Sequence, residues 1–116
     1  MSTNSCRMKF IADKTFNDAV KAFAKDNPSL LKIESEHAEK DPTRLGFDLQ
    51  TIAEIVTLIA ESLTIAELAI KVIEWLKESK SNKVIVQTPF RTVEVHNTKD
   101  LTEGEVRKIL KLSMEL

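Results

Sequence analysis

The sequence has few of the residues on which small binding sites are usually built. It contains no tyrosine, one cysteine and only two glycines among 116 residues. Because Cys6 is the only cysteine, the chain cannot form an intrachain disulfide or a thiolate cage around a metal ion. Gly46 and Gly104 are isolated, so neither belongs to a phosphate-cradling loop of the Walker or dinucleotide-binding kind. These absences exclude disulfide-stapled scaffolds and the common glycine-loop nucleotide sites.

An excess of charge of either sign is also lacking. The chain has 17 lysines and arginines against 18 aspartates and glutamates, a net charge of −1. No overall field therefore favours nucleic acid or an anionic membrane surface. The basic residues are scattered among acidic ones, and Phe90 is the nearest aromatic side chain that could stack on a base. We expect no nucleic-acid partner.

Segments that would target or anchor the chain are not predicted either. The first ten residues lack the apolar run of about 7–15 residues that a signal peptide needs. Residues 49–76 have the length of a membrane span, but Glu54, Glu61 and Glu67 recur within them. Each charge at membrane depth would cost about 2.5–3.5 kcal/mol. We therefore expect a soluble, cytoplasmic protein with no membrane partner.

The N-terminal part of the sequence predicts a β-α-β unit over residues 6–35. Cys6–Ala12 alternate between apolar and polar residues, which is typical of a half-buried strand. Thr15 can cap a following helix, which Asn27-Pro28 should end because proline disfavours the helical conformation in the residue before it. Leu30–Ser35 are a second strand candidate. The polar residues 36–47 that follow predict an exposed loop.

The densest apolar segment predicts a central helix or helix pair over residues 48–79. It contains no glycine or proline, and Asp48 can cap its start. Thr64 and Glu67 have the spacing of a capping box, which favours a break near Ser62–Thr64.

The C-terminal part of the sequence predicts a β-hairpin over 83–96 and a helix over 102–114. Thr102 and Glu105 form a second predicted capping box at the start of that helix. We expect Val84, Val86, Val93 and Val95 to face the helices, with Trp75 and Leu76 at the junction between helix and hairpin. The element order β-α-β-α(α)-β-β-α predicts a single α+β domain over residues 1–116, a two-layer sandwich of about four short strands with helices packed on one face.

The central segment also predicts self-association. Drawn as a helix, it carries two apolar stripes, whereas a helix docked on one sheet face needs only one. The second stripe needs cover, because large exposed apolar patches are rare on monomers. We therefore expect at least a homodimer. The predicted self-association or partner face consists of Ile52, Val56, Ile59, Leu63, Ile65, Leu68 and Val72.

Side chains that could carry chemistry lack partners in the sequence. His37 lies in a charged segment with no second histidine near it, and His96 follows a strand without an identifiable acid or nucleophile. Cys6 shares a strand face with Met8 and Phe10, as a small buried residue would. We predict no catalytic residue, no metal ligand and no cofactor, and we expect a chain that is not an enzyme.

The C-terminal half carries a resemblance to a known family. Trp75-Leu76, a lysine and serine connector, two Val-x-Val strands and the segment LTEGEVRKILKL follow one another. With the preceding β-α-β unit, this layout resembles the effector-associated constant component family, whose members are small subunits encoded in bacterial conflict and defence loci. The resemblance implies a non-enzymatic adaptor or scaffold that binds an effector, such as a caspase-like or trypsin-like peptidase.

An alternative remains open from the residues themselves. A small immunity or antitoxin-type inhibitor would use an acidic helical face, with Glu54, Glu61 and Glu67, to cover a basic site on its partner.

Overall fold

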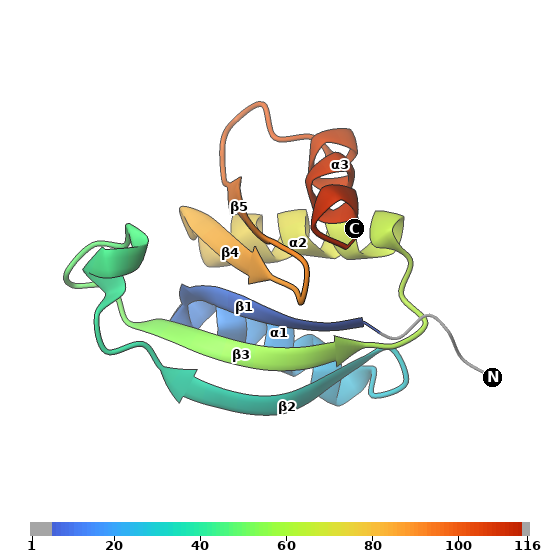
Figure 1. Ribbon diagram of the computed structural model, residues 1–116, viewed down its shortest axis with the longest axis horizontal. Helices are drawn as coiled ribbons and strands as arrows, with labels where there is room; N and C mark the ends of the chain where they lie inside the picture. Colours follow the sequence, from blue (N-terminus) through green and yellow to red (C-terminus); the bar gives the residue numbers. More distant parts are fainter. Residues whose placement is uncertain (1–5, 115–116) are drawn as a thin grey trace.

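One layer of helices packs against one antiparallel sheet in the computed structural model, which describes residues 6–114 (Figure 1). The described elements are β1 (Cys6–Asp13), α1 (Lys14–Asp26), β2 (Leu31–Ala38), a short 3-10 helix η1 (Pro42–Leu45), β3 (Ala53–Ala60), α2 (Ile65–Ser79), β4 (Lys83–Gln87), β5 (Thr92–His96) and α3 (Glu103–Met114).

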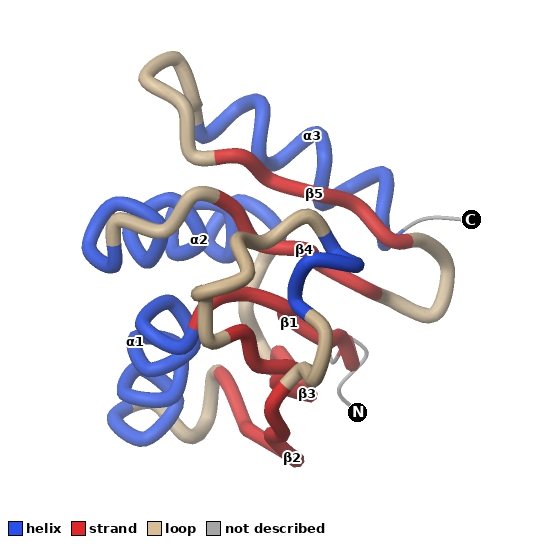
Figure 2. The backbone as a smooth tube through the Cα atoms, turned by 90° about the vertical axis from the view of Figure 1, so that its left-hand side faces the viewer, coloured by secondary structure: helices blue, strands red, loops and turns tan. Residues whose placement is uncertain are grey.

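The strands lie in the order β2-β3-β1-β4-β5, and each neighbouring pair is antiparallel. The elements from β1 to β4, η1 apart, therefore have the connections of the split β-α-β motif, and β5 and α3 extend it. Helices α1 and α2 lie side by side on one face of the sheet, and α3 continues their layer over β5 (Figure 2). The predicted α+β class with helices on one face is confirmed, although the described sheet has five strands rather than about four.

The fifth strand comes from the segment predicted as the first half of the central helix, and that prediction is wrong. Ala53–Ala60 form β3, which pairs with β1 on one side and with β2 on the other. Val56, Leu58 and Ala60 are buried, and the residues between them point to the opposite face. Apolar residues stand on both faces of this central strand, and such a short run cannot be distinguished from a buried helix by periodicity alone.

The second half of the segment is helical, and its predicted start is confirmed. The Thr64 hydroxyl accepts a hydrogen bond from the Glu67 N–H (3.1 Å), and the Glu67 carboxylate accepts one from the Thr64 N–H (3.0 Å). Both bonds of the capping box are therefore present. Ser62, just before it, has a positive φ of 61°. The predicted break is thus the place where a strand gives way to a helix.

Smaller boundary predictions also need correction. Helix α1 is capped by Asp13, not Thr15: the Asp13 carboxylate accepts hydrogen bonds from the Phe16 N–H (2.9 Å) and from the Thr15 hydroxyl (2.8 Å).

The predicted loop over 36–47 is shorter, because β2 extends to Ala38 and η1 occupies 42–45. His37 consequently lies on a strand rather than in a loop. The hairpin over 83–96 is confirmed, and the C-terminal helix begins one residue later than predicted, at Glu103.

An aromatic cluster fills the centre of the core. The Trp75 ring of α2 makes edge-to-face contacts with Phe10 of β1 and with Phe16 and Phe23 of α1, at centroid distances of 5.7–6.2 Å. Trp75 thus joins α2 to α1 and the sheet, whereas the predicted junction with the hairpin is made by its neighbour. There the Leu76 carbonyl accepts from the Asn97 side-chain amide (3.3 Å) and from the Ser81 N–H (3.2 Å).

The hairpin valines continue the core along the same face of the sheet, toward α3. Val84, Val86 and Val95 are buried, and Val93 is partly buried against them. They face Val106 and Leu110 of α3 within the same hydrophobic cluster. This confirms the sheet face that the sequence predicted for the four valines.

Truncating the cluster tests its role in stability. Trp75→Ala should lower the free energy of unfolding by about 3–5 kcal/mol, because it removes a large buried ring that touches three others. Urea denaturation followed by far-UV circular dichroism measures this change. An unchanged midpoint in a thermal melt would contradict the placement of Trp75.

Candidate functional site

The structure does not bring the seven residues of the predicted partner face together on one surface. Val56, Leu68 and Val72 are buried in the protein's own core. Ile59 lies on the opposite face of β3, and Ile52 is 64% exposed in the loop before it. Leu63 and Ile65 are half-buried at the start of α2. Because the segment is a strand followed by a helix, the two stripes do not run along one helix and no longer argue for a dimer. Self-association stays a prediction.

The sheet face turned away from the helices offers a different surface. Its residues follow from the strand register, since side chains at paired positions share a face. Arg7 of β1 stands opposite Ile59 of β3, which stands opposite Lys32 of β2. In the next row, Lys9 stands opposite Thr57. We call these five residues, Arg7, Lys9, Lys32, Thr57 and Ile59, the basic face.

The basic face has one internal ion pair. The guanidinium group of Arg7 holds the Glu34 carboxylate through two contacts, Nε to Oε1 at 2.8 Å and Nη2 to Oε2 at 2.9 Å. Glu34 is placed for this by a register shift in β2 between Ile33 and Ser35, where a bulge redirects a side chain. Within the part of the chain that the structure describes, the ammonium groups of Lys9 and Lys32 have no ion-pair partner.

The other end of this sheet face is covered by the chain itself. The segment 42–47 packs there over Ile11 and Ile85, which are buried although they face away from the helices. Lys83 holds the segment: its ammonium group donates to the Leu45 carbonyl (2.8 Å) and lies 4.9 Å from the centre of the Phe47 ring. The uncovered part of the face is therefore the basic end.

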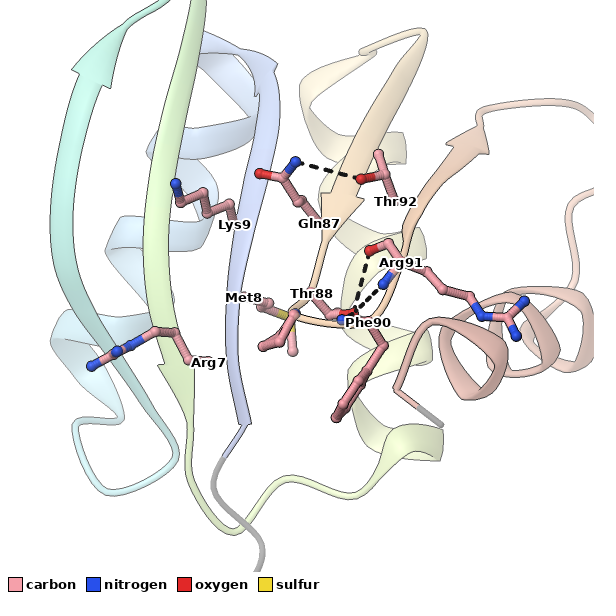
Figure 3. A pocket seen from close by; sticks show the side chains of 9 residues that line it. Arg7, Met8, Lys9, Gln87, Thr88, Phe90, Arg91 and Thr92 are labelled. Atoms are coloured by element: carbon pink, nitrogen blue, oxygen red, sulfur yellow. Dashed lines mark hydrogen bonds between the residues drawn. The ribbon is translucent and has the colours of Figure 1, made fainter. Parts of the chain in front are cut away.

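A cavity of about 440 Å³ adjoins the basic face at the point where two strands separate (Figure 3). Strand β4 pairs with β1 only at residues 85–87, while β1 continues back to Cys6. Beyond Gln87 the hairpin turns, with the Thr88 N–H donating to the Arg91 carbonyl (2.8 Å), and Pro89 has no N–H with which to extend the ladder. We call this cavity the notch. It is lined by Arg7, Met8, Lys9 and the turn residues 87–92.

The side chains with titratable groups that the sequence singled out are dispersed. His37 is exposed on β2, and His96, at the end of β5, lies 3.1 Å from the Glu94 carboxylate. Cys6 is half-buried at the start of β1, and burial raises the pKa of its thiol. Among residues 6–114, no group of three or more histidine, cysteine or acidic side chains is placed to hold a metal ion.

Two of the three acidic residues of the inhibitor alternative, Glu54 and Glu67, have partners within the chain. The Glu54 carboxylate lies 3.6 Å from the Lys21 ammonium group, between β3 and α1, and Glu67 belongs to the capping box. The pKa of the Glu67 carboxyl is lowered, first by the hydrogen bond from the Thr64 backbone N–H and then by the Thr64 side chain. These residues do not share one helical face, since Glu54 is on a strand.

The sequence contained part of the signal for the basic face. The alternation in Cys6–Ala12 already separates Arg7 and Lys9 from Met8 and Phe10. The sequence did not show that Lys32 and Ile59 lie beside them, because that depends on the pairing of β1 with β3 and of β3 with β2.

Comparison with family models, curated proteins and solved structures finds no significant match to this chain. In addition, none of the helices in the described part of the chain is both long and apolar enough to cross a membrane. The function is therefore argued from the geometry of the basic face and the notch.

The Cys6 thiol provides a check on burial at the start of β1. Because its pKa is raised in the folded chain, less thiolate is present at a given pH, and thiolate is the reactive form. The pH profile of its reaction with a disulfide reagent should have its midpoint at a higher pH in the folded protein than in the same protein unfolded in urea. Equal midpoints would contradict this description of Cys6.

Proposed function

We propose that the chain is a non-enzymatic adaptor or scaffold subunit that binds a protein partner through the basic face. One observation carries the proposal: Arg7 and Lys9 of β1 and Lys32 of β2 flank Ile59 of the intervening strand β3. They lie at the end of the sheet face that neither the α-helices nor the segment 42–47 cover. Among residues 6–114, Glu34 is the acidic residue that forms an ion pair with one of them, Arg7. Exposed cations around a partly buried apolar residue are suited to a partner segment that is acidic and partly apolar.

The centre of the face favours protein over nucleic acid as the partner. Thr57 and Ile59 occupy it, and both are half-buried. Nucleic-acid surfaces combine basic grooves with aromatic platforms on which bases stack. Here the neighbouring exposed ring, Phe90, belongs to the hairpin turn rather than to the face.

The resemblance to the effector-associated constant component family fits this role and suggests the kind of partner. An effector encoded beside this chain in a bacterial conflict or defence locus, such as a caspase-like or trypsin-like peptidase, is the partner that we propose. The proposal requires an acidic segment on the effector that can lie across strands β2, β3 and β1. Self-association can accompany such binding. If two copies met through their helix sides, the basic face of each would remain free for the effector.

Charge reversal on the face tests the proposal. The double variant Lys9→Glu and Lys32→Glu should weaken the complex with the co-expressed effector at least about tenfold, because attraction becomes repulsion at two exposed positions. The binding of the unchanged protein should also weaken as salt is added. Isothermal titration calorimetry at two salt concentrations measures both effects.

The matched control reverses the same number of charges on the helix side. Lys25 of α1 and Lys108 of α3 are both exposed, and Lys25→Glu with Lys108→Glu should leave the affinity unchanged. Equal loss in both double variants, or loss only in the control, would show that the basic face is not the binding surface.

A further inference from the structure

We propose that the notch receives one large apolar side chain, aromatic or aliphatic, from the acidic partner segment that lies on the basic face. This inference rests on the proposed function and specifies how the partner is anchored. It begins from the break in the sheet between β1 and the hairpin turn, which leaves a cavity of about 440 Å³ directly beside Lys9. Cavities upward of about 300 Å³ are of the size that holds ligand groups.

The floor and one wall of the notch are apolar. Met8 lies at its base and is 1% exposed, while the Phe90 ring at the turn is 50% exposed. Pro89 adds a further apolar lining. Because Met8 is already packed in the core, the unfilled contact is the half-exposed Phe90 ring, whose edge packs favourably with another apolar group.

The polar rim of the notch is already organised. The Gln87 side-chain amide reaches toward Thr92 across its upper edge and donates to the Thr92 hydroxyl (3.4 Å). The Thr88 hydroxyl accepts from the N–H groups of Phe90 and Arg91, both at 3.2 Å. The turn is therefore held in place, and an apolar group can enter without breaking hydrogen bonds of the rim.

The directions of the cations explain why an anchoring side chain fits better than an anion inside the notch. Arg7 and Lys9 extend over β3, away from the cavity, and Arg91 extends away from it on the other side (Figure 3). The charged groups thus flank the notch without converging in it. A partner residue seated in the notch would place acidic neighbours on either side within reach of Lys9 and Arg91.

A short peptide probe tests this arrangement. The probe is an acetylated, amidated hexapeptide with one phenylalanine between acidic residues, and a second peptide has alanine in place of the phenylalanine. Titration of the ¹⁵N-labelled protein should shift the backbone amide signals of Met8, Thr88 and Phe90 together with that of Lys9. The alanine peptide should bind about tenfold more weakly.

Substitution of Phe90, which forms one wall of the notch, is compared with substitution of an exposed apolar residue elsewhere. Phe90→Ser should reduce binding of the phenylalanine peptide to that of the alanine peptide, while Leu49→Ser, at another exposed apolar residue, should change nothing. Shifts at Lys9 and Lys32 that are the same for both peptides and unaffected by Phe90→Ser would overturn the notch proposal and leave the basic face standing. No shift with either peptide, up to millimolar concentration, would count against both.

Discussion

The contact of Trp75 with three phenylalanines is the interaction on which the arrangement of the molecule depends. It joins α2 to α1 and both helices to β1, at centroid distances near 6 Å. Because both helices meet the sheet through one aromatic cluster, they cover the same face. Neither α1 nor α2 covers the opposite face of the sheet. Large buried rings contribute more to such a junction than any hydrogen bond on the surface.

The uncovered face is divided into two unlike ends. At one end, Lys83 fixes the segment 42–47 over Ile11 and Ile85, so the chain supplies its own cover. At the other end, Arg7, Lys9 and Lys32 remain exposed beside the notch. The difference arises from local causes: a lysine that reaches a backbone carbonyl at one end, and a proline turn that ends the β1–β4 ladder at the other. Together they restrict a docking partner to the basic end.

The sequence predicted the elements whose signals are local. The capping box of Thr64 and Glu67, the alternation in Cys6–Ala12 and the hairpin valines were confirmed because each depends on residues a few positions apart. Strand β3 was missed because it is apolar on both faces, which only its place between β1 and β2 explains. The same error led to the predicted partner face, because that prediction placed Val56 and Val72 on one helix, whereas Val56 belongs to β3 and Val72 to α2. The rows of the basic face could not be predicted because they join strands about fifty residues apart in the chain.

The central claim is that the protein binds through the sheet face turned away from its helices, and isoleucine methyl groups on the two sides report on it directly. Ile59 lies on the basic face of β3, whereas Ile70 and Ile73 lie on α2. Cross-saturation from an unlabelled bound effector to isoleucine methyl groups of the deuterated chain measures which side is in contact. We expect loss of signal at Ile59, with Ile70 and Ile73 unchanged. Loss at Ile70 and Ile73, with Ile59 unaffected, would contradict it.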